Sequence, residues 1–502
     1  MVGLHSWAMS YPLLYEINTR CWLRELSVVA GRRLSLADIP ESEFAGWRER
    51  GFTHIWLMGV WPSGPRARKA ALADAMSRRV YAEVLRDWRE EDVAGSPYAV
   101  ADYVVAEELG GDEAMVVFRK RLNDAGLKLV LDFVPNHVGL DHRWIKERTE
   151  LFVQSATQMP ETFPVQRAIG TRWVAHGKDP NFPSWNDTAQ LDYRNPATRD
   201  AMIDQLQLVS SRCDGVRCDM AMLLLNDLFA RHWAKFPFSE AVPEREFWTE
   251  AIASVWRVHP EFLFISESYW GLESALQTLG FDFTYDKILF DELVYHDPSA
   301  VTRHLYEESS AAFIENSVHF LENHDEQRAA SAFVPAEHRA VALLILGLPG
   351  LRMLHEGQLT GGRTKIPVQL LRRPVEKVND EVKGIYDQLL RGVRDSAVGQ
   401  GRATLLRPRA AWPDNQTWRN FVIVQWQTQP GEFDVVVVNL VPHRCQCYVP
   451  LTIPNLASHH WSIRDLLGAE RYLRVGADLE RQGLYLDVPP YAAQIFHFQP
   501  GG

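Results

Sequence analysis

One unit recurs along the chain: a helical pattern, then Gly or Pro, then a short apolar run, then polar residues where that run ends. In the clearest copy, Asp112 is a suitable helix N-cap and Gly126 a suitable stop. Between them, apolar residues recur at helical spacing at positions 115, 118, 122 and 125. Strand-like apolar runs lie at 13–17, 52–58, 127–134, 215–219, 262–267, 318–325 and 351–356.

Apolar runs separated by helices predict parallel strands that are buried on both faces. The polar residues of this chain gather where the runs end, which is the carboxyl end of each predicted strand. This pattern predicts an α/β fold, a (β/α)₈ TIM barrel whose functional site lies on that rim.

Two stretches do not follow the repeat. Residues 139–195 are rich in Pro, Asp and aromatic residues without a clean period and are too long for a simple barrel loop, so they predict an inserted domain over the rim after the third strand. After residue 401 short strands at close intervals predict a C-terminal antiparallel β-sandwich. The predicted division is therefore 1–138 and 196–400 for the barrel, 139–195 for the inserted domain and 401–502 for the sandwich.

The charge of the chain narrows its partners. It has 53 Lys and Arg against 64 Asp and Glu, a formal net charge of −11, and no long basic run, which disfavours nucleic acid or an anionic membrane as the partner. No signal peptide is evident, and no apolar run is long enough to span a bilayer. The five cysteines, odd in number and mostly in apolar segments, favour a reducing compartment. We therefore expect a cytoplasmic protein with a small-molecule substrate.

Three acids follow separate apolar runs: Asp219, Glu267 and Asp325. Strand alternation puts Arg217 on the same face as Asp219, and an adjacent arginine favours the ionised carboxylate that a nucleophile requires. Glu267 precedes aromatic residues, surroundings that raise a carboxyl pKa toward that of a general acid. Two carboxylates about 5–5.5 Å apart serve a retaining glycosidase, and a third can stabilise positive charge in the transition state.

These motifs resemble those of the α-amylase superfamily, glycoside hydrolase family 13. Its four short regions have counterparts in the same order at 132–137, 215–219, around Glu267 and at 323–325, and residues 190–195 are similar to a fifth signature. The resemblance implies that Asp219 is the nucleophile, Glu267 the acid/base and Asp325 the transition-state stabiliser. It also implies that the glucosyl ring is held by Tyr98, His137, Arg217 and His324.

Departures from the family pattern at two places, and one match to it, bear on the substrate. Met222 and Leu223 stand where many members carry Lys-His to contact an acceptor sugar, and Ala99 replaces an acid that often follows the ring-stacking tyrosine. An apolar surface at Met222 and Leu223 would suit a small or non-sugar aglycone. Arg328 matches an arginine that in relatives reaches the ring or braces its acid partners, and a plain salt bridge at the rim is the alternative.

The sequence therefore predicts a retaining α-glycosidase that hydrolyses short α-glucosides through a covalent glycosyl-enzyme intermediate. A transglycosylase or phosphorylase of the same family is one alternative, and a non-catalytic sugar-binding protein is another from a different class. No cofactor or catalytic metal is expected. A structural calcium stays open, because Asn136 corresponds to a calcium ligand of the family.

Overall fold

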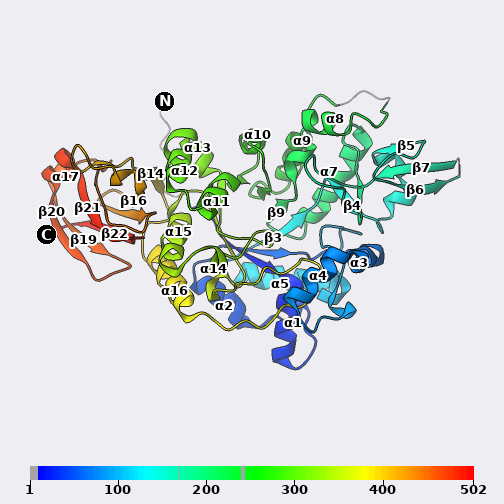
Figure 1. Cartoon of the computed structure of the whole chain (residues 1–502), viewed down its shortest axis with the longest axis horizontal. Helices are drawn as coiled ribbons and strands as arrows, with labels where there is room; N and C mark the ends of the chain where they lie inside the picture. The colour runs from blue at the N-terminus through cyan, green and yellow to red at the C-terminus, as the bar shows by residue number, and fades with distance from the viewer. Residues whose placement is uncertain (1–9, 169, 239–242, 502) are drawn as a thin grey trace.

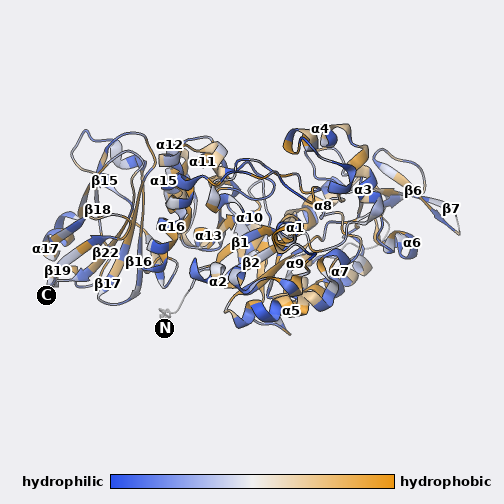
Figure 2. Cartoon of the chain, turned by 90° about the horizontal axis from the view of Figure 1, so that it is seen from below, coloured by the Kyte–Doolittle hydropathy of each residue, from blue (hydrophilic) through white to orange (hydrophobic). Residues whose placement is uncertain are grey.

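The computed structural model describes residues 10–168, 170–238 and 243–501. A β-barrel lies in the middle of an elongated molecule, with the C-terminal sheets at one end and the hairpin of β6 and β7 at the other (Figure 1). A second view at right angles shows the same order, with β1 and β2 between the two ends (Figure 2).

Eight parallel strands close the barrel in the order β1-β13-β12-β11-β10-β9-β3-β2, which confirms the predicted fold class. Their bounds are β1 (Leu13–Asn18), β2 (His54–Met58), β3 (Lys128–Phe133), β9 (Gly215–Cys218), β10 (Leu263–Ser266), β11 (Phe283–Tyr285), β12 (Ser317–His319) and β13 (Leu351–His355). The apolar runs predicted seven of these strands and missed β11, which is only three residues long.

One predicted strand is shorter than expected. The apolar run 318–325 predicted a strand to Asp325, but β12 ends at His319. Phe320 and Leu321 stay buried in the core although they lie outside the strand, so the apolar pattern continues past the last strand residue. Residues 322–325 are thereby left in a loop over the barrel rim.

Helices cover the outside of the barrel (Figure 1). The longer ones are α1 (Thr19–Ala30), α2 (Glu41–Glu49), α3 (Gly64–Ala73), α4 (Ala75–Val84), α5 (Gly111–Asp124), α7 (Pro196–Ser210), α9 (Phe247–Trp256), α11 (Lys287–Val294), α15 (Pro335–Gly347) and α16 (Asp380–Arg394). Local sequence sets their ends: the Asn195 side chain caps α7, and Pro196 occupies its first turn, where a missing N–H has no cost. No helix in the described ranges is long and apolar enough to cross a membrane.

Helix α5 fills the predicted helical segment but not with the predicted cap. The cap is Gly110, whose φ of 100° lies in the left-handed region that favours glycine. Asp112 lies inside the first turn, where it accepts a hydrogen bond from the Val105 N–H and pairs with Arg212. The carboxylate that looked like a cap therefore ties α5 to a neighbouring loop and to Arg212, two residues past the end of α7.

The segment between β3 and α7 carries two small antiparallel sheets. In one, β4 (His137–Gly139) pairs with β8 (Thr188–Gln190). In the other, β7 (Gly170–Ala175) pairs with both β5 (Gln154–Ser155) and β6 (Thr162–Arg167). The boundaries proposed for the inserted domain stay a prediction, but β4 and β8 show that this segment returns to the carboxyl end of β3.

The C-terminal region packs a six-stranded sheet, β14-β16-β17-β22-β19-β20, and a three-stranded sheet, β15-β18-β21, around a shared apolar core. The strands are β14 (Arg402–Leu405), β15 (Arg409–Ala410), β16 (Phe421–Gln429), β17 (Glu432–Asn439), β18 (Cys445–Val449), β19 (His460–Asp465), β20 (Arg471–Val475), β21 (Leu484–Val488) and β22 (Ala493–Pro500). The region also contains helix α17 (Gly476–Gln482), which an all-β pattern did not predict. The Trp426 indole donates to the carbonyl of Gly347, joining this region to α15.

Candidate active site

Arg217 occupies the centre of a group of acids at the carboxyl ends of the barrel strands. It is 1% exposed, and its Nη1 donates to Asp219 Oδ1 at 2.7 Å. Its Nη2 pairs with Glu267 Oε2 at 2.8 Å. One guanidinium therefore joins the two acids that directly follow β9 and β10, which keeps their carboxylates close together.

Aromatic rings enclose the same guanidinium. The rings of Trp56, Tyr98 and Tyr285 lie with centroids 5.3, 5.3 and 5.8 Å from its central carbon. Such rings attract a cation and exclude water from it. The ion pairs around Arg217 therefore lie in surroundings of low polarity, where charges interact strongly.

Asp219 differs from the sequence expectation in its electrostatics. Burial, together with the charge of Glu267, raises the pKa of Asp219 to about 8, and Arg217 only partly opposes this rise. Arg217 does not keep Asp219 ionised by itself, because it is shared with Glu267. Two carboxylates that share one cation titrate as a pair, and such a pair can hold one proton near neutral pH.

The backbone after β9 positions Glu267. Met220 adopts a left-handed conformation with φ of 45°, and its N–H donates to Glu267 Oε2 at 2.7 Å. The Tyr269 hydroxyl donates to the other oxygen, Oε1, at 2.7 Å. A strained non-glycine residue at such a place is typical of functional sites. Glu267 is thus fixed by three donors, two from β9 and the turn after it and one from its own loop.

The loop after β12 supplies the third acid and its histidine partner. His324 Nε2 lies 3.0 Å from Asp325 Oδ2, and its Nδ1 lies 2.5 Å from Glu16 Oε1. Although desolvation raises it, the pKa of Asp325 is held well below its usual range by the charge of His324. The Asp325 side chain is 52% exposed, whereas the side chains of Asp219 and Glu267 are only 9% and 5% exposed. Asp325 therefore lies at the mouth of the site.

Tyr98 and His137 complete the predicted set. The Tyr98 hydroxyl lies 2.7 Å from His324 Nε2, and the two rings stack at 5.3 Å. His137 Nε2 lies 3.1 Å from the main-chain oxygen of Tyr98, and burial lowers the pKa of His137 to about 4, so its ring is neutral at neutral pH. His137 also packs against Trp185, at 5.0 Å between ring centres, which brings the segment between β3 and α7 to the site.

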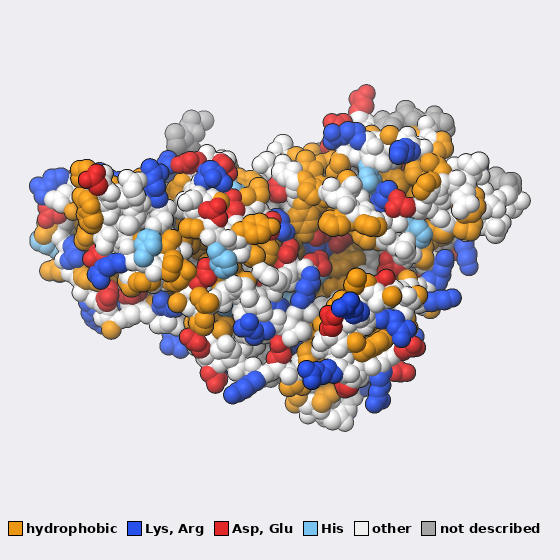
Figure 3. All heavy atoms as spheres, in the orientation of Figure 1, with side chains coloured by type: hydrophobic (Ala, Val, Ile, Leu, Met, Phe, Trp, Pro, Cys, Tyr) orange, Lys and Arg blue, Asp and Glu red, His pale blue; other side chains and the backbone are white. Residues whose placement is uncertain are grey.

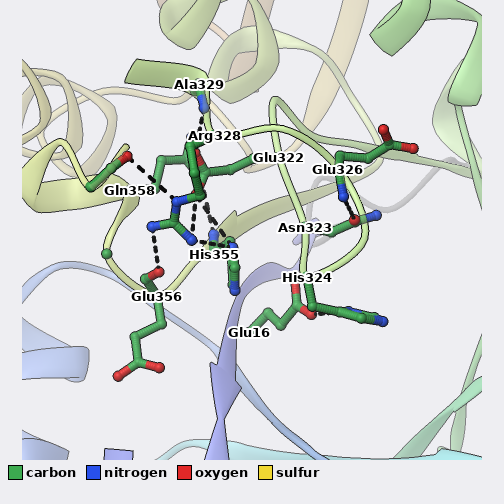
Figure 4. Close-up of polar contacts among 12 residues, drawn as sticks. Glu16, Glu322, Asn323, His324, Glu326, Arg328, Ala329, His355, Glu356 and Gln358 are labelled. Atoms are coloured by element: carbon green, nitrogen blue, oxygen red, sulfur yellow. Dashed lines mark hydrogen bonds and ion pairs between the residues drawn. The ribbon is translucent and has the colours of Figure 1, made fainter. Parts of the chain in front are cut away.

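Arg328 belongs to a second network beside the first. Its Nη1 lies 2.7 Å from His355 Nδ1 and 3.2 Å from Glu322 Oε1, and its Nη2 donates to the carbonyl of Glu356 (Figure 4). No contact between Arg328 and the three acids is found among the described residues. This geometry favours the rim salt bridge, and a role for Arg328 in sugar binding stays a prediction.

The structure corrects one prediction about the substrate side of the site. Met222 and Leu223 were expected to offer an apolar surface, but they are 0% and 4% exposed and pack into the barrel core. The left-handed turn at Met220 leads directly into the short helix Ala221–Leu224, which buries both side chains. The Lys-His pair of many family members is therefore absent here, and no accessible apolar surface takes its place.

Two acids of the site carried no assigned role in the sequence. Asp132, at the end of β3, accepts from the Gly59 N–H and lies 3.8 Å from Arg217 Nη1, and burial raises its pKa to about 6. Glu16 lies on β1 and binds His324. Each is a lone acid in an apolar strand, and Asp132 also begins the 132–137 motif; these are the sequence signals that could have identified them.

The surroundings of Asn136 do not fit a calcium ion as they stand. The Gln190 side-chain amide donates to both the main-chain and side-chain oxygens of Asn136, at 2.8 and 3.0 Å. Calcium requires several free oxygen ligands, and an N–H donor on these two oxygens competes with a cation. Within the described ranges, no group of three or more His, Cys, Asp or Glu side chains is arranged to hold a metal.

The face drawn in Figure 3 is hollowed near the middle, between the C-terminal end and the end that carries β6 and β7. Acidic and hydrophobic side chains lie on the floor of this hollow (Figure 3). A concave surface with buried acids and aromatic walls is typical of a small-molecule site.

Known proteins share both the sequence pattern and the fold. Curated relatives include the alpha-amylase MalA of Haloarcula japonica, 25% identical over 55% of this chain and 38% of its own length. Another is Maltase 1 of Drosophila virilis, 23% identical over 53% of this chain and 49% of its own length. The matches thus span less than half of these two relatives.

Solved structures match almost the whole chain. A noncanonic maltogenic alpha-amylase, AmyB, from Thermotoga neapolitana has a TM-score of 0.68 at 18% identity, over 98% of this chain and 99% of its own. Trehalose-6-phosphate hydrolase from Bacillus licheniformis has a TM-score of 0.64 at 14% identity, over 98% and 99%. The model of the alpha amylase catalytic domain matches residues 48–366, more than half of the chain and the part that holds Asp219, Glu267 and Asp325. Because that model matches here and the barrel carries these acids on its rim, the chain belongs to the α-amylase family of glycoside hydrolases.

Proposed function

We propose that the protein is a retaining α-glycosidase that acts on short α-glucosides. The observation that carries the proposal is the shared guanidinium of Arg217, which brings Asp219 and Glu267 together as a buried pair. A retaining glycosidase needs two close carboxylates of unequal protonation, one to attack and one to donate a proton.

The proposed reaction has two steps. Asp219 attacks the anomeric carbon while Glu267 gives its proton to the departing glycosidic oxygen, so that a β-linked glycosyl ester forms and the aglycone leaves as an alcohol. Water then attacks the same carbon, Glu267 takes its proton, and the bond to Asp219 breaks. Inversion twice at one carbon returns the α-anomer.

The remaining residues hold the ring and balance its charge. Asp325 and Asp219 face the positive charge that develops on the sugar in both transition states. His324, Tyr98 and His137 offer hydrogen-bonding groups beside these acids, and Arg217 orients the reacting pair. The protonated ring of His324 and the guanidinium of Arg217 can only donate hydrogen bonds, so they bind the oxygen atoms of sugar hydroxyl groups.

Three features support a short substrate. The two reacting acids are almost fully buried, while Asp325 lies at the mouth, so one ring reaches the centre from one side. The buried Met222 and Leu223 stand where many family members carry the Lys-His pair that contacts an acceptor sugar. Relatives of known name include a maltase and a trehalose-6-phosphate hydrolase beside the amylases.

All five cysteines are buried and unpaired, which supports a reducing compartment and an intracellular substrate pool.

The test follows the stereochemistry of the first product. We expect proton NMR to show the α-anomer before mutarotation, with substrates drawn from maltose, isomaltose, trehalose, sucrose and glucosylglycerol. Early appearance of the β-anomer would refute the retaining mechanism. Adding a sugar or inorganic phosphate as acceptor separates hydrolysis from transfer: a glycoside or glycosyl phosphate as the main product would assign the second step to the acceptor instead of water.

A further inference from the structure

His324 is bound by a carboxylate at each of its ring nitrogens. Nδ1 lies 2.5 Å from Glu16 Oε1, and Nε2 lies 3.0 Å from Asp325 Oδ2. An ionised carboxylate only accepts hydrogen bonds, so each nitrogen that faces one must carry a proton. The geometry therefore requires an imidazolium between two carboxylates, with the Tyr98 hydroxyl as a further partner of Nε2.

Glu16 is placed by the barrel itself. On β1 it lies in register with Trp56 of β2 and His355 of β13, and it is 0% exposed. Figure 4 shows Glu16 between His324 and His355. Its second oxygen, Oε2, has no hydrogen-bond partner among the described residues. The one hydrogen bond of this carboxylate therefore goes to His324.

The charges around Glu16 leave His324 as its cation. His355 accepts a hydrogen bond from Arg328 at Nδ1, and burial lowers the pKa of His355 to about 3, so this ring is neutral at neutral pH. Burial raises the pKa of Glu16 and the neighbouring histidines His355 and His324 lower it, with a net lowering; because the His355 ring is neutral at neutral pH, His324 is the histidine that brings a positive charge to Glu16. For His324, burial lowers the pKa, but Asp325 and Glu16 outweigh it, so the pKa lies well above 6.5.

Every neighbouring element contributes a group that faces this pair. Trp56 of β2 presents its ring to His324 at 5.6 Å, and Tyr98 stacks on its face. Asp132 of β3 interacts with His324 and Glu16 through charge alone, and Arg217 of β9 interacts with Glu16 in the same way. None of these groups replaces the bond from Nδ1 to Glu16.

We infer that Glu16 is a positioning residue of the glycosidase reaction, which holds His324 as an imidazolium with its Nε2–H directed at Asp325. The inference rests on the proposed function, because the proposed glycosidase reaction is what assigns His324 to sugar binding and Asp325 to stabilising the transition state. Loss of the Glu16 charge would let His324 release its proton at a lower pH. A neutral ring has one proton for two nitrogens, so it no longer donates to residue 16 and Asp325 at once and no longer brings a positive charge to Asp325.

The Glu16→Gln variant separates this role from packing, because glutamine has nearly the same shape and still accepts from Nδ1. An adjacent opposite charge shifts a pKa by about 1 to 3 units, so we expect the pKa of His324 to fall by about 1 to 3 units, until His324 instead of Glu267 sets the alkaline limb of kcat/KM and moves it to lower pH. Activity should recover as the pH is lowered. An equal loss at every pH, or an unmoved limb, would overturn the inference.

Glu322→Gln is the matched control. Glu322 is also a fully buried carboxylate of the rim, but it contacts Arg328, His355 and the Ala329 N–H instead of His324. We expect its alkaline limb to stay where it is in the wild type. An equal displacement in both variants would assign the effect to the loss of any buried rim carboxylate and would overturn the specific role of Glu16.

A double-mutant cycle tests whether Glu16 acts through the histidine. In a His324→Gln background, adding Glu16→Gln should cause no further loss of kcat/KM, because the two changes remove one unit. Losses that multiply would show that Glu16 acts by another route and would contradict the proposal.

A measurement on the wild-type protein keeps the inference testable if Glu16→Gln does not fold. In protein carrying 13C-labelled histidine, the His324 signal is the one missing from the His324→Gln variant. We expect it to stay in the imidazolium position after the exposed histidines have titrated near pH 6.5. Titration together with them would refute the inference. This readout needs no turnover, so it holds even if the glycosidase assignment fails.

Discussion

The Arg217→Lys variant tests whether one guanidinium must join the two reacting acids. Arg217 is almost fully buried and pairs with Asp219 and Glu267 through separate nitrogens. A lysine keeps the charge, but its ammonium is a compact point charge that cannot span two carboxylates. One of them then stays buried without its partner, and breaking a buried ion pair in this way costs about 3–5 kcal/mol.

This cost falls on the ionised form of the pair, so it raises the pKa of its carboxyls. At about 1.4 kcal/mol per unit, the rise is about 2 to 4 units. A raised carboxyl pKa delays ionisation, so the acid limb of kcat/KM moves to higher pH. At pH 7 we expect a loss of about 100- to 10,000-fold, with recovery of up to about tenfold for each unit that the pH is raised.

The assay is kcat/KM on an aryl α-glucoside between pH 5 and 9, with Arg352→Lys as the control. Arg352 is another buried arginine, on β13, but it donates to the main-chain oxygens of Tyr11 and Leu346 instead of carboxylates. Its replacement should lower stability without moving the acid limb. If Arg217→Lys leaves the acid limb at its wild-type position, the shared guanidinium does not control the protonation of the pair.

Further predictions concern the acids, metals and substrate length. Asp219→Asn should abolish turnover with the fold intact, and wild-type-like activity would remove Asp219 from its role. Because folding raises the pKa of Asp219 from 3.8 to about 8, the stability that its protonated form contributes at low pH is lost as the pH rises through 8. The variant should therefore have a higher Tm than the wild type at pH 9 but not at pH 3. Glu267→Ala should slow substrates with poor leaving groups far more than activated aryl glucosides and remove the upper limb of the bell-shaped pH profile, whereas equal losses on both substrates would exclude Glu267 as the acid. Chelation should leave turnover unchanged, because Arg217 and His324 supply the positive charge of the site, and lost activity at an unchanged Tm would contradict this. Measured kcat/KM should favour di- and trisaccharides over long maltodextrins, and internal cleavage of long chains would refute the short-substrate proposal.

The barrel could be predicted because its strands are short apolar runs between helices. Seven runs were visible, but β11 was not, since Phe283–Tyr285 has three residues and lies between two aspartates. The burial of Phe320 and Leu321 beyond β12 likewise follows from tertiary packing that no local pattern records. Strand ends were therefore harder to predict than strands.

The acids could be predicted from their place at the strand ends, but their partners could not. Glu16 and His324 are 308 residues apart, and only closure of the barrel brings them into contact. The orientation of Arg328 depends in the same way on Glu322 and His355, which come from the ends of two neighbouring strands. The burial of Met222 depends on the left-handed turn at Met220. Methionine does not favour this conformation, so the sequence does not predict it.

The site as a whole has an excess of negative charge. Two buried cations are each shared by two carboxylates: Arg217 by Asp219 and Glu267, and His324 by Glu16 and Asp325. With one proton on the first pair, these four acids and two cations leave one net negative charge, and Asp132, whose pKa of about 6 leaves it largely ionised at neutral pH, adds to the excess. In a site of low polarity such a charge is costly until a positive partner arrives. The positive charge that develops on a glucosyl ring during cleavage is that partner, so the protein stabilises the transition state more than the neutral substrate.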